Sequence, residues 1–513
     1  MDFAFEVRES DLMGRIGRIR VGGKVLETPC LFPVIHPVSQ SVTTHELESM
    51  GFRGLMTNSY IIMSRRKDEA LEKGIHNMLD YSGVLMTDSG GYQVLEYGDL
   101  GVGYRRIASF QMGIGSELSV TLDRPTGFNA SEDYARSTVQ CSLRNAVSTM
   151  EEYGQEKTVW VGPVQGGLFL GLLSKSAVSL VRAGFVFLAL GSPVEVMKSY
   201  RFSELVAMIV ATRRAIPYSV PLHLFGAGHP LTVGLAVALG CDTFDSASYI
   251  LFARGGRYMT ELGVSRLDLM EFLPCSCPIC SKTTVAGLRE LDFKDRTRSL
   301  ALHNLHVLRK EVEACKEAIA EGRLWDFVQE KAMAHPRLFG ALGGFANAGA
   351  LPREGTPLLK EKGLFVRDAR DLARPELAVA RERLKRCTKR SSRTAVLVNS
   401  DLPLPLSRLR LRTENLPARC DFYRLHPALG PYPAELEFVY PYTQTVSPSG
   451  GYGRASSAAL KQLRSIGYSR VLVVSAESTA RSAASGARSK LTPKGSSPFL
   501  PSTSARPLLP RHP

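Results

Sequence analysis

The 513-residue sequence lacks any run of about 18 consecutive apolar residues, which is the least that a membrane-spanning helix needs. Its N-terminus also lacks the charged and apolar pattern of a cleavable targeting segment. Cysteine is sparse, and six of the nine are dispersed, as is usual for reduced, buried thiols in a chain without a secretion signal. We therefore expect a cytoplasmic protein that does not contact a membrane.

Acidic residues are outnumbered by basic ones, 49 against 64, which gives a formal net charge of +15. From residue 476 onward there are six Lys or Arg and one Glu, so five of these charges lie in the last segment. The remaining excess of ten still favours a polyanionic partner such as nucleic acid.

The first half of the chain contains eight short apolar runs, and amphipathic stretches such as 131–153 and 202–215 lie between many of them. Alternation of strand and helix predicts a parallel sheet, and eight strands predict a closed (β/α)8 TIM barrel. Several runs end on a polar residue or a glycine turn, and the clearest is residues 85–87, which lead into Asp88-Ser89-Gly90-Gly91. A buried strand that delivers a carboxylate at its tip is typical of a ligand site.

Equivalent polar residues follow other runs, namely Asp123, Gln165, Gly191-Ser192 and Asp245. In a TIM barrel the active site lies at the C-terminal ends of the strands, where these residues would meet. A single acid after a strand often only caps the next helix. Three Asp and one Gln in equivalent places are poorly explained by capping alone, so we interpret them as site residues.

Three cysteines gather in the CxCxxC motif Cys275, Cys277 and Cys280, and His303 and His306 follow on the amphipathic stretch 297–313. Three thiolates and one imidazole form a closed tetrahedral site that suits structural Zn²⁺. The spacing leaves open which histidine completes the set. Because all four positions would be filled by protein, no position is left for water, and we expect a structural ion.

The chain is long enough for a large barrel and further domains. We predict a barrel with its zinc knuckle over residues 1–345, a helical and basic linker over 346–390, and a small α/β extension over 391–475. Residues 476–513 are mostly Ser, Ala, Pro, Thr, Arg and Gly with no apolar periodicity, which predicts a disordered low-complexity tail.

Taken together, these motifs resemble the tRNA-guanine transglycosylase family over about residues 2–345. The resemblance rests on residues 87–93 (Thr-Asp-Ser-Gly-Gly-Tyr-Gln), 162–167 (Gly-Pro-Val-Gln-Gly-Gly), 244–247 (Phe-Asp-Ser-Ala) and the cysteine motif with His303. Residues 58–60, 97–99 and 190–192 are similar to the archaeal branch, the archaeosine enzymes. Residues 390–475 resemble the first C-terminal extension of that branch.

The resemblance implies exchange of guanine 15 in the D arm of tRNA for 7-cyano-7-deazaguanine through a covalent tRNA–enzyme intermediate. Such an exchange needs one carboxylate to attack the ribose C1′ and a second to manage protons on the two bases. By resemblance Asp245 is the nucleophile and Asp88 the acid/base, although the sequence alone permits the reverse assignment. A single structural Zn²⁺ held by Cys275, Cys277, Cys280 and His303 is likewise implied.

Recognition of the base is expected from four further places. A purine edge needs an acceptor for its N1–H and exocyclic amine, which Asp123 supplies. Gln165 and the backbone of Gly191 and Ser192 would read O6 and its neighbours, and Tyr92 would stack on the base. The base must leave the tRNA interior to reach them, which costs unstacking energy.

The sequence departs from the family pattern in two places. Arg124-Pro125-Thr126-Gly127 stands where a Thr-Pro-Pro type turn usually follows the recognition acid. Archaeal members usually end in a PUA domain that grips the tRNA, whereas here the low-complexity tail follows. We expect weaker tRNA binding with an intact barrel, a homodimer, and a role for a separately encoded PUA-domain protein.

Three other functions are compatible with part of the pattern. A glycoside hydrolase also uses paired carboxylates on a barrel, but it would not need a zinc knuckle or a basic surface. A non-catalytic tRNA-binding subunit would be expected to have lost Asp88 or Asp245, and both are present. Exchange at the anticodon, as in bacterial relatives, is disfavoured by the C-terminal extension.

Overall fold

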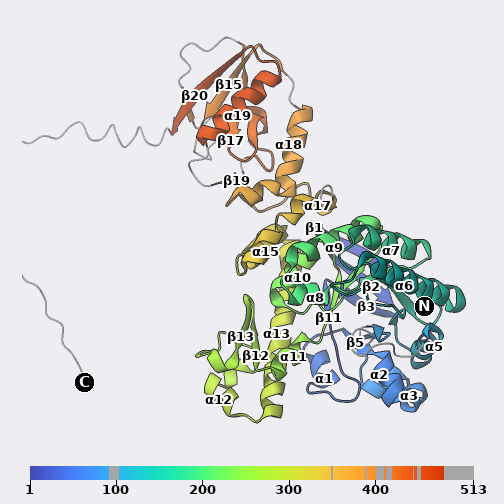
Figure 1. Ribbon diagram of the computed structural model, residues 1–513. Helices are drawn as coiled ribbons and strands as arrows, with labels where there is room; N and C mark the ends of the chain where they lie inside the picture. Colours follow the sequence, from blue (N-terminus) through green and yellow to red (C-terminus); the bar gives the residue numbers. More distant parts are fainter. Residues whose placement is uncertain are drawn as a thin grey trace, which may run out of the picture. The chain divides into compact units, whose positions relative to one another are not determined.

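The computed structural model describes residues 1–91, 103–347, 351–387, 390–399, 409–411, 419–442, 444–447 and 452–478 (Figure 1). Tyr92, residues 97–99 and the part of the predicted tail beyond Ser478 lie outside these ranges. The chain divides into two compact units, Met1–Arg386 with Gln444–Pro448, and Cys387–Thr443 with Ser449–Pro513. Within the described ranges, no helix has the length and apolar character needed to cross a membrane.

Eight parallel strands form the centre of the first unit, in the spatial order β4-β11-β10-β9-β8-β7-β6-β5. A backbone bridge between Val34 and Met56 joins the two outer strands, so the sheet closes on itself. The predicted (β/α)8 barrel is thereby confirmed. The strands are β4 (Cys30–Pro33), β5 (Gly54–Asn58), β6 (Val84–Asp88), β7 (Leu118–Val120), β8 (Val159–Val164), β9 (Phe187–Leu190), β10 (Leu222–Leu224) and β11 (Thr243–Ser246).

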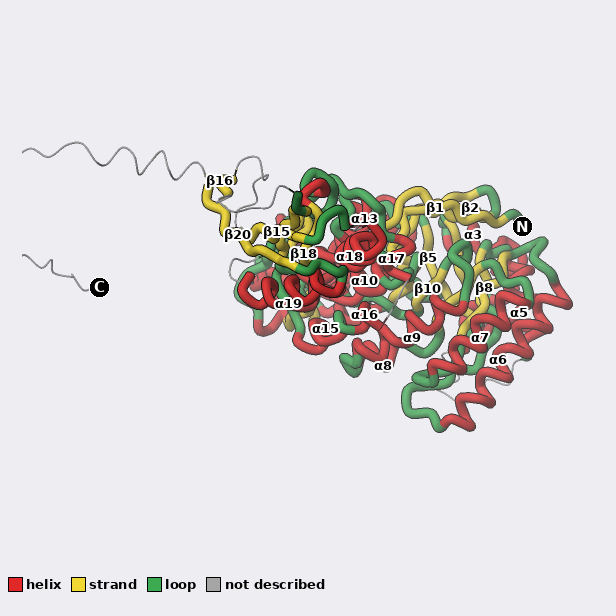
Figure 2. Tube along the Cα trace, turned by 90° about the horizontal axis from the view of Figure 1, so that it is seen from above, coloured by secondary structure: helices red, strands yellow, loops and turns green. Residues whose placement is uncertain are grey.

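Helices follow the strands and cover the outside of the barrel, and Figure 2 shows α5, α6 and α7 lying outside the strands. The α6 helix begins where the Ser131 hydroxyl accepts the Tyr134 N–H, and Ala135, Val139 and Ala146 form its buried stripe. The helices are α1 (Thr44–Ser49), α2 (Ser59–Arg65), α3 (Lys67–Leu79), α5 (Tyr104–Ile114), α6 (Glu132–Tyr153), α7 (Leu170–Arg182), α8 (Val194–Lys198), α9 (Phe202–Ala215), α10 (Pro230–Ala238) and α11 (Ser248–Arg254).

An antiparallel sheet of β1 (Phe3–Asp11), β2 (Gly14–Val21) and β3 (Lys24–Thr28) precedes the barrel. Its side chains Ile19, Val21 and Leu26 share a buried apolar cluster with barrel-interior residues such as Phe32 and Met86. Because β3 leads directly into the start of β4, this sheet closes the N-terminal end of the barrel. The opposite end is left for a ligand.

After β11 the chain forms a hairpin, β12 (Arg257–Thr260) and β13 (Gly263–Arg266), the cysteine motif, α12 (Val285–Glu290) and the 28-residue helix α13 (Phe293–Ala320). Buried apolar residues of α13, including Leu300, Leu305 and Val312, belong to the main core of the unit. The helix contacts α10, α11 and β12. It therefore ties the hairpin to the barrel wall.

Residues 324–387 hold α14 (Leu324–Ala332), α15 (Pro336–Ala341), α16 (Gly344–Asn347), α17 (Leu351–Gly355), β14 (Leu364–Phe365) and α18 (Pro375–Cys387). Buried ion pairs connect parts of this segment to one another and to β1 of the N-terminal sheet. Lys360 Nζ lies 2.7 Å from Asp11 and 2.6 Å from Glu376, and Arg374 forms a two-pronged pair with Asp326 at 2.9 and 3.0 Å. We call these five residues the anchor cluster.

The second unit contains β15 (Thr394–Asn399), β16 (Leu409–Leu411), β17 (Asp421–His426), β18 (Gly430–Pro433), α19 (Tyr452–Ser465) and β20 (Arg470–Ser478). Its sheet has the order β16-β20-β15-β17-β18, and α19 packs against it through Ala459 and Leu463. The unit is thus α/β, as predicted for the region after the barrel. Strand β20 runs two residues past 476, where the low-complexity tail was expected to begin.

Candidate active site and metal site

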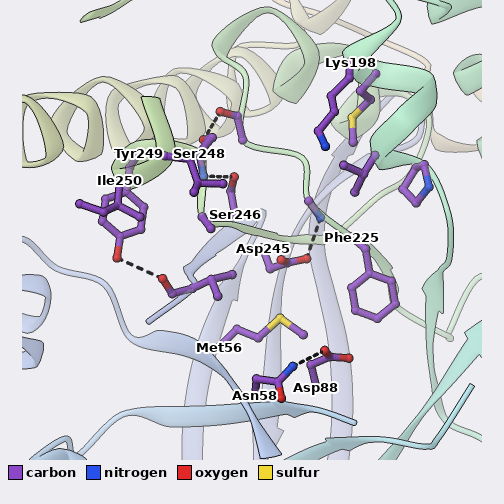
Figure 3. A pocket seen from close by; sticks show the side chains of 18 of the residues that line it. Met56, Asn58, Asp88, Lys198, Phe225, Asp245, Ser246, Ser248, Tyr249 and Ile250 are labelled. Carbon is purple, nitrogen blue, oxygen red and sulfur yellow. Dashed lines mark hydrogen bonds between the residues drawn. The ribbon is translucent and has the colours of Figure 1, made fainter. Parts of the chain in front are cut away.

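A cavity of about 750 Å³ opens at the C-terminal end of the barrel. Each of the eight strands, or the loop directly after it, contributes to its lining. Figure 3 shows Asn58, Asp88 and Asp245 around this cavity. Six of the site residues predicted from the sequence line it, namely Asp88, Asp123, Gln165, Gly191, Ser192 and Asp245.

Asp245 stands near the end of β11 and is held through one of its two carboxylate oxygens. Oδ1 accepts a hydrogen bond from the Gly226 N–H at 2.8 Å and lies 3.0 Å from His223 Nε2. Among the described residues, no group bonds to Oδ2. The carboxylate is therefore fixed in direction, with one oxygen left for a ligand.

Asp88 ends β6, and Asn58, from the neighbouring strand β5, donates its Nδ2–H to Asp88 Oδ2 at 2.9 Å. The Asn58 Oδ1 accepts the Ile61 N–H at the start of α2, which sets the orientation of the amide. Burial, together with the nearby charges of Asp123 and Asp245, raises the pKa of Asp88 to about 7. Near neutral pH this carboxyl can both give and take a proton, as an acid/base catalyst must.

Asp123 and Gln165 form a bonded pair on the next side of the cavity. Gln165 Nε2 donates to Asp123 Oδ2 at 2.6 Å, while its Oε1 accepts from the Thr126 N–H at 3.1 Å and the Ser192 hydroxyl at 2.9 Å. This arrangement leaves the second Nε2 hydrogen of Gln165 for a carbonyl group of a ligand. Burial raises the pKa of Asp123 to about 6, against the hydrogen bond from Gln165.

Two glycines lie against this pair. A Cβ added to Gly91 would fall 2.0 Å from Asp123 Oδ1, and one added to Gly191 would fall 2.3 Å from Gln165 Nε2. No side chain fits at either position without displacing the acid or the amide. The glycine turns after β6 and β9 therefore allow the backbone to approach the Asp123–Gln165 pair closely.

Cys275, Cys277, Cys280 and His303 bring one ligand atom each to within 4.8 Å of one another. His303, on α13, lies with Nδ1 3.5 Å from Cys277 Sγ and 3.4 Å from Cys280 Sγ, and its Nε2 bonds the Met259 carbonyl oxygen at 2.8 Å. This bond assigns the proton to Nε2 and leaves Nδ1 for a metal ion, a common arrangement at metal sites. The cluster can bind one metal ion and contains His303, not His306.

A sequence model of the family described as queuine tRNA-ribosyltransferase matches residues 10–337. The chain belongs to the tRNA-guanine transglycosylase family. It is 37% identical over 450 residues to a protein of Sulfolobus acidocaldarius named tRNA-guanine(15) transglycosylase, which covers 87% of this chain and 89% of the relative. A protein of the same name from Thermococcus kodakarensis is 38% identical over 447 residues, which cover 87% of this chain and 72% of that relative. Another, from Aeropyrum pernix, is 45% identical over 333 residues, which cover 65% of each chain.

This transglycosylase has functional-site residues that the sequence did not single out. Phe225 and His229 line the cavity, and the buried His223 lies 3.0 Å from Asp245 Oδ1 without lining the cavity itself. His229 caps α10 and accepts the Leu231 N–H on Nδ1, and burial lowers its pKa to about 4, so the ring stays neutral. Residues 226–230, Gly-Ala-Gly-His-Pro, resemble an anion-binding glycine turn only weakly, and no other spacing pattern in the sequence marks these residues. Their positions in the site are determined by which strands pair with each other and by the register of that pairing, neither of which can be read from the sequence.

Proposed function

We propose that this transglycosylase exchanges guanine 15 in the D arm of tRNA for 7-cyano-7-deazaguanine. The contrast between Asp245 and Asp88 within one cavity carries the proposal. Asp245 has one oxygen held by two donors and the other free, which suits a nucleophile. Asp88 has a pKa raised to about 7, which suits a group that shuttles a proton. Relatives named for guanine 15 support the choice of target base.

The reaction has two halves. Asp245 Oδ2 attacks the ribose C1′ as the bond to guanine N9 breaks, and protonated Asp88 gives its proton to the departing base. The ribose is then held as an ester of Asp245. In the second half Asp88 takes the N9 proton of the incoming base, N9 attacks C1′, and the carboxylate leaves. One N-glycosidic bond replaces another, so no energy input is needed.

Recognition of the base is assigned to the Asp123–Gln165 pair. The Asp123 carboxylate would accept the N1–H and the exocyclic amine, and the remaining Gln165 N–H would bond O6. Phe225, which lines the cavity beside Asp245 (Figure 3), offers a face for stacking. A base without this donor and acceptor pattern would leave buried polar groups unpaired, which gives strong discrimination.

The tRNA is the polyanionic partner in this proposal. Arg254 and Arg257 line the cavity, and neither pairs with a carboxylate in the described part of the chain. Guanidinium groups at the opening can bind phosphates beside an extruded nucleotide and offset the cost of unstacking. The predicted homodimer and the separate PUA-domain partner stay predictions.

We assign one structural Zn²⁺ to the Cys275, Cys277, Cys280 and His303 cluster. Three thiolates and one imidazole are the donors that zinc prefers, and the four side chains fill a tetrahedral set. The ion would join the cysteine motif to α13, and with no open position it takes no part in base exchange.

The deciding experiment measures entry of radiolabelled guanine into an unmodified tRNA transcript, with wild type beside Asp245→Ala and Asp88→Asn. Label should enter only with wild type, be chased out by 7-cyano-7-deazaguanine, and be lost from a transcript that carries adenine in place of guanine 15. Release of free guanine without incorporation would indicate a hydrolase instead. Label in the adenine-substituted transcript would move the target elsewhere, the anticodon guanine being the first position to test.

A further inference from the structure

His223 is a fully buried histidine inside the barrel, on β10. Its Nε2 lies 3.0 Å from Asp245 Oδ1, and its Nδ1 lies 2.8 Å from Thr243 Oγ1. The strand register explains this line of three side chains. His223 is the ladder partner of Thr243 on the parallel strand β11, and Thr243 and Asp245 are two residues apart, so they project from the same face.

Aromatic side chains fix the plane of the imidazole. The Phe32 ring meets it edge-on at a centroid distance of 6.0 Å and 73°, and the Phe225 ring does so at 5.1 Å and 69°. Buried between them, the imidazole has little freedom to turn. The direction of the Nε2 bond to Asp245 is therefore set by packing.

The two hydrogen bonds also assign the proton of the ring. An ionised Asp245 can only accept, so the His223 proton resides on Nε2. In a neutral ring Nδ1 is then an acceptor, and the Thr243 hydroxyl is the donor to it. One proton on the ring and one on the hydroxyl satisfy the whole line, so Asp245 sets the tautomer of His223 and the Thr243 hydroxyl is compatible with it.

We propose that His223 is a positioning residue for Asp245, with its Nδ1 satisfied by the Thr243 hydroxyl; this inference rests on the proposed base exchange. His223 and the Gly226 N–H together hold Oδ1, so that Oδ2 faces C1′. When Oδ2 forms the ester, Oδ1 becomes the ester carbonyl oxygen and keeps both donors. When the incoming base attacks C1′, negative charge returns to the carboxylate, and the same donors stabilise it. His223 thus assists both halves of the reaction without touching the tRNA.

The test compares His223→Leu, His223→Gln and Thr243→Val with wild type in the guanine-exchange assay. His223→Leu removes the donor and should lower kcat by about 100-fold, the low end of the cost of losing one preorganised donor. The KM values for guanine and tRNA should stay within about twofold, because the lost interaction is not one of ground-state binding. His223→Gln keeps an N–H in reach and should recover most of kcat, and Thr243→Val should lose about tenfold.

His76→Leu is the matched control. His76 also pairs with a buried carboxylate, Glu117, at 2.8 Å, but Glu117 stands before β7, at the opposite end of the barrel. This variant should lose thermal stability and keep kcat. A wild-type kcat in folded His223→Leu, or equal losses in the Leu and Gln variants with a raised KM, would overturn the proposal. Absence of exchange with wild type would instead overturn the proposed function.

Discussion

Two sets of buried acids in the first unit have opposite surroundings. In the anchor cluster, Glu376 lies 2.6 Å from Lys360, and although burial acts to raise its pKa, Lys360 and Arg374 hold that pKa below its usual value. In the cavity, no Lys or Arg forms an ion pair with Asp88 or Asp123 in the described part of the chain, and burial raises the pKa of both. A buried acid with a cation is a structural link, whereas one without a cation keeps a proton that it can exchange.

Asp11 shows that an ion pair can offset only part of the effect of burial on the pKa of an acid. It shares Lys360 with Glu376, and burial, the largest influence, raises its pKa despite the lysine. One ammonium group thus serves two carboxylates and compensates one of them better than the other. The direction in which the pKa of each buried acid is shifted therefore depends on how many cations lie beside it.

The same substitution placed in each set should separate the two roles most clearly. Asp245→Asn should lower exchange by at least about 10⁴-fold, as loss of a nucleophile does, with an unchanged circular dichroism spectrum and no covalent tRNA adduct on a denaturing gel. Adduct formation by this variant at a rate near wild type would assign the nucleophile to another residue, Asp88 being the first candidate.

Asp326→Asn in the anchor cluster should have the converse effect. Arg374 and Arg367 both lose their bond to a charged carboxylate, so the free energy of unfolding should fall by about 3–5 kcal/mol, as when a buried ion pair loses one partner. Denaturant unfolding measures the loss, and the folded fraction should form adduct at the wild-type rate. An unchanged unfolding midpoint would show that these buried pairs do not stabilise the unit.

A methyl group at Gly191 should test whether ligand binding needs the hydrogen bond from the neutral side chain of Gln165 to Asp123. Its Cβ would displace Gln165 from Asp123, so Gly191→Ala should raise the KM for guanine by about tenfold, the value of one hydrogen bond to a charged group. Gly171→Ala, in α7, is the control, because a Cβ there meets no atom within 4 Å. Equal KM values in the two variants would contradict the role given to Gln165.

The pH dependence of the reaction rate and of stability should show the smallest difference between the cavity acids and the anchor cluster. In the proposed mechanism, formation of the covalent adduct needs protonated Asp88, so the single-turnover rate of this step should fall by up to about tenfold per pH unit as the pH rises above about 7. Folding raises this pKa, so the stability due to Asp88 is lost as the pH rises through about 7. Glu376, with a lowered pKa, loses its contribution as the pH falls instead. Asp88→Asn should therefore raise the melting temperature more at pH 8 than at pH 5. A rate that increases through pH 7 would make Asp88 a base in the first step.

Much of the cavity could be predicted because its residues follow strands. In a parallel barrel the carboxyl ends of all strands meet, so Asp88, Asp123, Gln165 and Asp245 converge whatever the register. His223 escaped prediction because its contact with Asp245 depends on the pairing of β10 with β11, and a buried histidine on an apolar strand has no marking pattern.

The anchor cluster could not be predicted for a related reason. Lys360 and Asp11 are 349 residues apart, and neither belongs to a motif. The sequence predicts a helical and basic linker over residues 346–390, but a buried lysine and an exposed one look alike in a sequence. Only the packed structure shows that residues of this expected linker form buried ion pairs with β1 and α14.

The sheet of β1, β2 and β3 has a consequence for the order of events. It plugs one end of the barrel with Ile19, Val21 and Leu26, so the bases come and go through the other end. In the proposed reaction the ribose is bound to Asp245 between the two halves, so the departing and the incoming base would occupy the same site in turn. The departing base would have to leave before the incoming base can bind, which predicts ping-pong kinetics. Free guanine would then compete directly with the replacement base for the site.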